Sequence, residues 1–185
     1  MKTNISIFVF VFLIVIVGNG LYEQINKEPI SAKAKRLECQ KAVISFEKGF
    51  DNNDIKNAQL QLENGNFKFT SYVEKSQYME SQLFNYVKLS SIDQIVNKEL
   101  KSYIKEDIPS EDKLNIIYYI YENDKQHPGK KTEKSKNYAG YVVFKFKNTK
   151  NRLVFQSQID FMNMQGLDIP KSINCAIKSF VTYNK

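Results

Sequence analysis

The 185-residue chain has no tryptophan, and it is poor in the residue types that most often build catalytic, metal and redox sites. It has one histidine, two cysteines and seven scattered glycines. A serine–histidine–aspartate triad would therefore have to use that one histidine, His127. The glycines form no glycine-rich loop that could cradle a phosphate. We accordingly expect a chain that carries no cofactor and is not an enzyme.

Arginine is also scarce, although the chain is basic. Its 27 basic residues outweigh 20 acidic ones and give a net charge of +7, but only Arg36 and Arg152 are arginines. Arginine supplies the planar fork that reads guanine edges and clamps phosphates. Lysines spread along the whole chain are more typical of a solvated surface, so we predict no specific nucleic-acid binding. Weak attraction to an anionic surface or polymer is compatible with the charge.

The N-terminus has the one long apolar run, ISIFVFVFLIVIV at residues 5–17, which follows Lys2. This layout is typical of a secretory signal peptide, and small residues around Gly20 offer a cleavage position. If the segment is not cut, the uncharged residues 3–22 form a helix of roughly 30 Å, enough to anchor the protein in the inner membrane. Both alternatives predict an extracytoplasmic protein, either periplasmic or secreted.

The chain is predicted to have three parts. Residues 1–20 are the signal peptide or membrane anchor, residues 21–36 are a polar tether, and residues 37–185 form a single domain. In an oxidising compartment an isolated pair of cysteines is most simply a disulfide, so we predict that Cys39 is bonded to Cys175. Cys-x-x-Cys spacing is absent, which disfavours a catalytic dithiol. Two thiols and one histidine are too few for a closed zinc site, so we predict no metal.

Several segments of the domain have a clear period. Residues 115–122 are β-branched and aromatic, which predicts a central strand, and residues 138–147 and 152–162 predict two strands joined by a hairpin. Apolar residues at helical spacing behind Pro170 predict a closing helix; they are Ile169, Ile173, Ile177 and Phe180.

Other segments give weaker patterns. Alternating residues on both sides of Asn64-Gly65 predict a hairpin over residues 60–69. Helical spacing predicts a helix over residues 79–87 and a second one that begins at Ser91, where Gln94 would complete a capping box. Residues 39–50 suit either a strand or a helix, since so short a run does not distinguish them.

The order of these elements predicts an α+β fold with a largely antiparallel sheet and amphipathic helices packed on one face. An amphipathic helix across a curved sheet resembles the cystatin-like or nuclear-transport-factor-like arrangement. This is an analogy of architecture alone, because no motif in the chain marks a family.

The loop at residues 124–137 is the most distinctive polar segment, and it is locally basic. We predict that it contributes to partner binding through its lysines, which are Lys125, Lys130, Lys131, Lys134 and Lys136. The many tyrosines nearby could line a ligand groove, since tyrosine buries a ring and keeps a polar tip.

These observations favour an exported, non-enzymatic domain that binds a protein or an acidic polymer of the cell envelope. If the leader is uncut, the membrane is a second partner. The alternative is a carrier of small apolar ligands, with its pocket between the Ser91 helix and the sheet. A hydrolase that uses His127 is a third hypothesis, disfavoured because the histidine lies in a polar loop where water competes for any partner.

Overall fold

The structure is a computed structural model that describes residues 37–130 and 132–184. The leader and tether predicted for residues 1–36 lie outside the described residues. In chain order the elements are α2 (Glu38–Lys41), β1 (Ser45–Gly49), α3 (Asn52–Glu63), β2 (Phe67–Glu74), a 3₁₀ turn (Leu83–Asn85), α4 (Leu89–Lys101), β3 (Leu114–Glu122), a second 3₁₀ turn (Glu133–Lys136), β4 (Gly140–Lys147), β5 (Leu153–Phe161) and α5 (Ile169–Val181).

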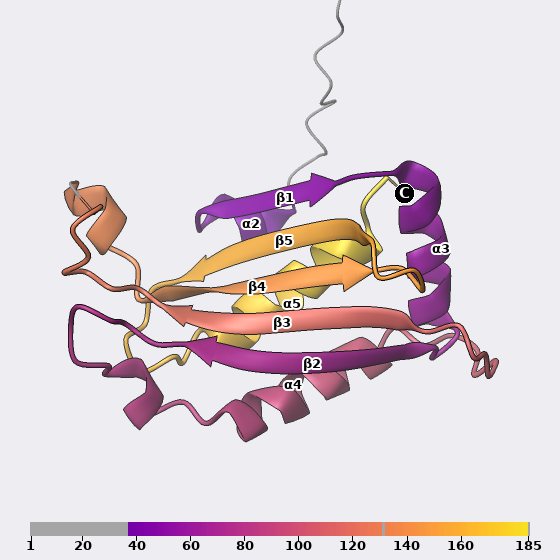
Figure 1. The fold of residues 1–185 in the computed structure, drawn as a ribbon, viewed down its shortest axis with the longest axis horizontal. Coiled ribbons are helices and arrows are strands. Elements are labelled where there is room, and N and C mark those ends of the chain that lie inside the picture. The colour runs from indigo at the N-terminus through magenta and orange to yellow at the C-terminus, as the bar shows by residue number, and fades with distance from the viewer. Residues whose placement is uncertain (1–36, 131, 185) are drawn as a thin grey trace, which may run out of the picture. The chain divides into compact units, whose positions relative to one another are not determined.

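The five strands form one sheet in the order β1-β5-β4-β3-β2, as Figure 1 shows. Neighbours are antiparallel except β2 and β3, which are parallel over the full length of β2. A parallel pair requires the chain to return to the starting end of the sheet, and α4 makes that crossover. The α+β prediction with a largely antiparallel sheet is confirmed, whereas the parallel pair was not predicted.

Two helices cover one face of the sheet. In Figure 1, α5 lies behind the strands and α4 runs along β2. The Phe180 ring of α5 stacks on Phe146 of β4 with centroids 3.8 Å apart. The buried stripe of α4, Ile92, Val96 and Leu100, joins the same core. The predicted packing of amphipathic helices on one face therefore holds.

The hairpin predicted over residues 60–69 is wrong, because residues 52–63 form α3. Asp51 caps this helix by accepting the N–H of Asp54 at 2.9 Å. Gly65 ends it at φ 74°, with bonds from Gly65 N to Leu62 O and from Asn66 N to Gln61 O. This is the Schellman motif, which needs the same positive φ as a tight hairpin turn, so Asn-Gly does not distinguish the two.

Two helix predictions also need correction. Residues 79–87 contain only the short 3₁₀ turn, and the N–H groups of Gln82 and Leu83 bond to Glu122 rather than to a preceding helical turn. The other helix, α4, begins at Leu89 with Lys88 as its N-cap residue, so Ser91 lies inside the helix and forms no capping box.

The segment left open, residues 39–50, is divided between the single turn of α2 and the edge strand β1. In the part of the chain that the structure describes, no helix has both the length and the apolar character needed to span a bilayer.

The predicted disulfide is confirmed. Cys39 in α2 is bonded to Cys175 in α5, at a sequence separation of 136 and with 5.9 Å between their Cα atoms. The bond therefore ties the first described helix to the last one.

Candidate functional site: the open face of the sheet

The second face of the sheet is turned away from α4 and α5, and none of the described helices covers it (Figure 1). We call the outward-pointing side chains of the five strands, together with the loop side chains that pack on them, the open face. The pairing register arranges them in rows that cross the sheet. One row crosses all five strands and consists of Phe46, Gln158, Val143, Tyr119 and Tyr72.

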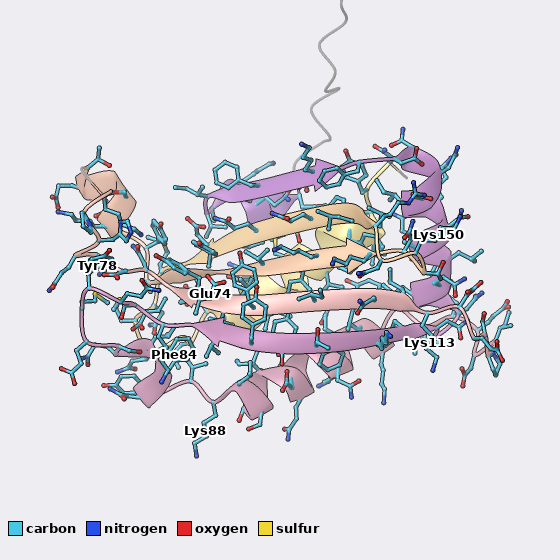
Figure 2. All side chains as sticks on the ribbon, viewed as in Figure 1. Glu74, Tyr78, Phe84, Lys88, Lys113 and Lys150 are labelled. Atoms are coloured by element: carbon cyan, nitrogen blue, oxygen red, sulfur yellow. A yellow bond between two sulfur atoms is a disulfide. The ribbon has the colours of Figure 1, made fainter. Side chains whose placement is uncertain are left out.

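The neighbouring row lies nearer the 124–137 loop and has an acidic residue at each end. It consists of Asp160, Tyr141, Tyr121 and Glu74. Figure 2 labels Glu74, which projects from this face, and Lys150, which lies beyond the opposite end of the strands.

Five tyrosines gather on the open face, and we call them the tyrosine cluster: Tyr72, Tyr119, Tyr121, Tyr138 and Tyr141. Tyr72 stacks on Tyr119 with ring centroids 4.9 Å apart, and Tyr121 stacks on Tyr141 at 4.4 Å. In each pair, the face of one ring therefore contacts the face of the other ring. Tyr72 keeps 40% of its surface exposed at the edge of the sheet.

The hydroxyl groups of this cluster stay protonated at neutral pH. Burial, the charge of Glu74 and the neighbouring Tyr72 raise the pKa of Tyr119 to about 12. Burial is also the main cause that raises the pKa of Tyr141, Tyr121 and Tyr138. A neutral phenol donates a hydrogen bond, so the cluster offers several donors to a ligand.

Lys130 folds back from its loop onto the tyrosine cluster. Its Nζ atom lies 5.0 Å from the ring centre of Tyr138 and 5.5 Å from that of Tyr121. The ammonium group donates to Asn123 Oδ1 and, at 3.2 Å, to the hydroxyl of Tyr138. Burial lowers the pKa of Lys130, while the charges of Asp124 and Asp160 oppose that shift. This lysine is a fixed cation of the open face.

Asp160 is a buried carboxyl group near the end of β5. It is 3% exposed, and its Oδ1 accepts a long hydrogen bond of 3.4 Å from Gln158 Nε2. Burial raises its pKa to about 6, although Gln158 and the charge of Lys130 act in the opposite direction. Asp160 also lines a shallow cleft of about 370 Å³ together with apolar side chains, among them Val43, Ile44 and Met162.

Lysines occupy the other end of the open face. Lys145 lies 5.4 Å from the ring centre of Tyr119, and its row also contains Lys48. Lys68 and Lys147 both pair with Asn115 in the next row. The face is therefore aromatic at one end and basic at the other.

Two buried acids hold the loops beside the tyrosine cluster. Glu122 is 0% exposed, and it accepts the N–H groups of Gln82 at 2.7 Å and Leu83 at 2.8 Å. Asp124 accepts those of Gln77 and Tyr78, each at 2.7 Å. Burial favours the neutral form of both acids, but these hydrogen bonds outweigh it and lower the pKa of each. The two carboxylates are thus structural anions that fix the loop at residues 75–83.

The predicted loop lysines do not share one environment. Lys130 packs on the tyrosine cluster, Lys136 forms an ion pair with Glu133 at 3.3 Å, and Lys125 is half-buried. Residue 131 and the side chain of Lys134 lie outside what the structure describes. Of the three predicted lysines whose side chains the structure describes, it brings Lys130 onto the open face.

His127 is exposed at the tip of a turn. Its Nδ1 atom accepts the N–H of Gly129 at 3.0 Å, and its ring meets Tyr78 edge-on at 4.9 Å. Among the hydrogen bonds of the described residues, none joins this imidazole to a serine hydroxyl or to a carboxylate.

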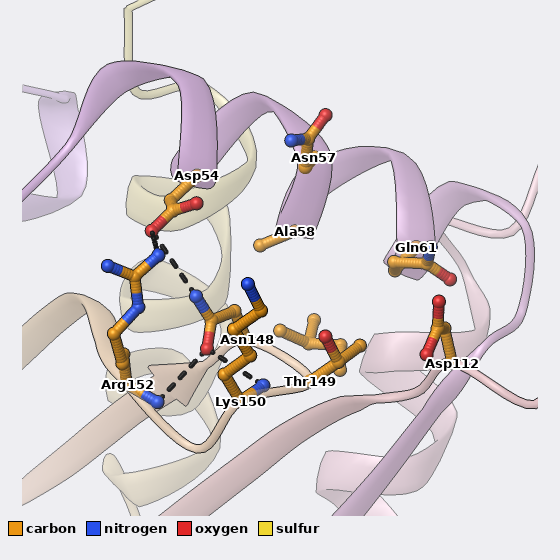
Figure 3. Close-up of a pocket in the computed structure, with 10 residues that line it drawn as sticks. Asp54, Asn57, Ala58, Gln61, Asp112, Asn148, Thr149, Lys150 and Arg152 are labelled. Carbon is orange, nitrogen blue, oxygen red and sulfur yellow. Dashed lines mark hydrogen bonds and ion pairs between the residues drawn. The ribbon is translucent and has the colours of Figure 1, made fainter.

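A second pocket lies away from the open face, between α3 and the β4–β5 hairpin (Figure 3). Its volume is about 250 Å³. Asp54 accepts hydrogen bonds from Arg152 Nη2 at 3.0 Å and Asn148 Nδ2 at 3.2 Å, while Gln61 and Asp112 face each other across the other end. These hydrogen bonds connect the β4–β5 hairpin to α3, so the polar side chains at this end of the pocket have a structural role.

Comparisons with family models, with curated proteins and with solved structures find no match.

The carrier hypothesis places a ligand between α4 and the sheet. In the structure that space belongs to the core, where Leu100, Tyr118 and Phe144 are each fully buried. The Tyr118 hydroxyl also donates to Asp93 of α4, which closes the same space with a polar contact.

The sequence suggests that tyrosines near the 124–137 loop line a ligand groove, but it does not indicate Asp160, Tyr72 or the stacked pairing of the rings. The signal was available in part, because strict alternation within residues 115–122 and 138–147 places their tyrosines on defined faces. The strand order was not available from the sequence, and it is the order that brings Tyr72 beside Tyr119 and Asp160 beside Tyr141.

Proposed function

We propose that this protein is an exported, non-enzymatic binding domain that holds an acidic partner on the open face of its sheet. The observation that carries the proposal is the combination of the tyrosine cluster with fixed lysines on a face that no described helix covers. The partner would be an acidic protein or an acidic polymer of the cell envelope.

The chemistry of the face supports an anionic partner. Neutral tyrosine hydroxyls donate hydrogen bonds to carboxylate or phosphate oxygens, and lysines add positive charge beside them. Tyrosine is enriched at protein interfaces because its ring gives contact area while its hydroxyl finds a polar partner. Lys130 and Lys145 are held by aromatic rings, so binding would cost less side-chain ordering than it would for free lysines.

The compartment is supported by the disulfide, since such bonds form and persist in oxidising environments. A periplasmic or secreted location also agrees with the apolar leader. The leader would either be cut or anchor the domain in the inner membrane.

The test measures the affinity of the full-length protein, purified in detergent, for poly-L-glutamate. Lys145→Gln with Lys147→Gln removes two charges from the open face, and we expect the dissociation constant to rise about tenfold. Lys150→Gln with Lys178→Gln removes the same charge elsewhere and should change it less than about twofold. Equal losses in the two double variants would mean that net charge alone attracts the polymer, and the proposal would be wrong.

A second variant separates the aromatic contribution from the charge. Tyr72→Ala and Tyr119→Ala together remove one stacked pair and leave every lysine in place. We expect weaker binding with an unchanged dependence on salt, because the lost contact is not ionic. Parent-like affinity in this variant would show that the tyrosines belong to the fold and not to the site.

A further inference from the structure

The edge of the sheet formed by β2 lacks several of the features that protect a free edge: it is eight residues long and has neither proline nor a bulge. All eight residues of β2 pair with β3 on one side, and no described strand lies on the other side. Natural edge strands are usually short, are covered by a helix or loop, or carry proline, a bulge or charged side chains, and β2 has only the last of these within its own sequence, at Lys68 and Glu74. Between Phe67 and Glu74 there is no proline and no shift of register, and the charged residues point outward. We propose that this edge pairs with β2 of a second copy of the chain.

The sequence of β2 is self-complementary when two copies run antiparallel. Residues directly opposite each other in such a pair lie on the same face, and a two-fold axis passes through one residue of each strand. With the axis at Ser71, Lys68 lies opposite Glu74 of the other copy, and this ion pair occurs twice.

The same register matches the remaining side chains. On the open face Thr70 lies opposite Tyr72 of the other copy, and on the core side Phe69 lies opposite Val73. Aromatic–β-branched and opposite-charge pairs are the cross-strand combinations that stabilise antiparallel strands. Every pair around Ser71 between residues 68 and 74 therefore joins compatible side chains.

Neighbouring registers lose this match. An axis at Thr70 would place Lys68 opposite Tyr72, and an axis at Tyr72 would place Glu74 opposite Thr70, so neither forms the ion pair. A shift of one residue would turn the core side of one strand toward the open face of the other. The charges thus select a single register.

The core side of β2 is also incompletely covered in one copy. Phe67 and Phe69 pack against the hydrophobic core but are only half-buried, as is Val73. A second β2 strand would lie beside these side chains and remove more of their apolar surface from water, which favours association.

The other edge of the sheet does not offer the same pairing. β1 has five residues, and an axis at its centre, Glu47, would place Phe46 opposite Lys48 with no ion pair. Glu47 itself is engaged within the chain, since it accepts hydrogen bonds from Gln40 and Ser179. Association through β2 alone gives a closed dimer, in which two open faces form one continuous surface.

A charge exchange tests both the dimer and its register. The full-length protein is purified in detergent, and its dissociation constant is measured by analytical ultracentrifugation. Lys68→Glu places glutamate opposite glutamate twice, and Glu74→Lys places lysine opposite lysine twice, so each should raise the dissociation constant about tenfold. The double variant, with both changes, restores the ion pairs in reverse and should return to within about threefold of the parent.

Lys68 and Glu74 lie roughly 20 Å apart within one strand, so recovery in the double variant cannot come from a contact inside one copy. Lys150→Glu makes the same charge change as Lys68→Glu, but in the β4–β5 hairpin rather than at the β2 edge (Figure 2), and should leave dimerisation unchanged. A parent protein that is monomeric at about 100 μM, above the range of ordinary specific dimers, would overturn the proposal. A double variant as weak as the single ones would also overturn it. The open-face variants at Lys145 and Lys147 are tested separately, so failure of one proposal does not decide the other.

Discussion

Asp160 differs from the other buried acids at this end of the sheet because few hydrogen-bond donors surround it. Glu122 and Asp124 are also buried, yet several backbone N–H groups stabilise their charged forms. Asp160 accepts one long side-chain bond, so burial dominates and raises its pKa to about 6. At the same end of the sheet, the pKa of Asp160 is therefore raised while those of Glu122 and Asp124 are lowered. The number of hydrogen-bond donors around each carboxyl group decides the direction of the shift.

This difference predicts a pH-dependent contribution of Asp160 to stability. Its folded pKa lies above the ordinary value of 3.8, so the unfolded chain releases the proton first as pH rises. The free energy of unfolding should therefore fall between about pH 4 and pH 6, by about 2–3 kcal/mol for this group. Asp160→Asn removes the titrating group while keeping its shape, so the variant should gain stability relative to the parent over that range.

Urea unfolding at several pH values measures the effect, and other acids cancel when the variant is compared with the parent. Asp112→Asn, at an exposed position, is the matched control and should follow the parent profile. Parallel profiles for Asp160→Asn and the parent would contradict the assigned cause.

At the scale of elements, α3 shows how one glycine ends a helix and starts the strand that forms the sheet edge. Gly65 has φ 74°, and a Cβ atom there would lie 3.2 Å from Asp107 Oδ1. We predict that Gly65→Ala lowers the free energy of unfolding by about 1–2 kcal/mol, because alanine is strained in the left-handed region. Gly65→Asn should cost less, since asparagine tolerates that conformation.

Thermal unfolding of both variants against the parent checks the order. If alanine and asparagine destabilise the protein equally, contact with Asp107 rather than backbone strain is the main cost.

The elements with regular periods could be predicted from the sequence. Residues 115–122, 138–147 and 152–162 alternate or are β-branched, and β3, β4 and β5 lie there. The closing helix was also predictable, because Pro170 and a wide apolar stripe mark its start and its buried face. These segments depend on local patterns that tertiary contacts reinforce.

The remaining elements depend on partners distant in sequence. The 79–87 segment has helical spacing, but Glu122 takes its N–H groups and holds it as a loop. Asn64-Gly65 fits a hairpin or a helix end equally well, and the buried face of α3 decides between them. The open face was only half predictable, since alternation gives the faces of single strands but not their order.

At the scale of the whole molecule, the disulfide joins the two ends of the described domain. Closing a loop of 136 residues lowers the entropy of the unfolded chain, which corresponds to about 5 kcal/mol at most. We predict that Cys39→Ser together with Cys175→Ser lowers the free energy of unfolding by about 2–5 kcal/mol. Urea unfolding of the variant and of the reduced parent should agree, and a reduced parent as stable as the oxidised one would contradict the prediction.

The pairing of β1 with β5 has a consequence for how the chain acquires its fold. Ser45 pairs with Ile159, and Cys39 is bonded to Cys175. The first described elements therefore reach their final contacts only after nearly the whole chain has been synthesised. Contacts between such distant residues slow folding, since a long loop must close before any energy is gained. A nascent chain that lacks β5 and α5 can form neither the β1–β5 pairing nor the disulfide, so the complete fold is reached only when almost the whole chain is available.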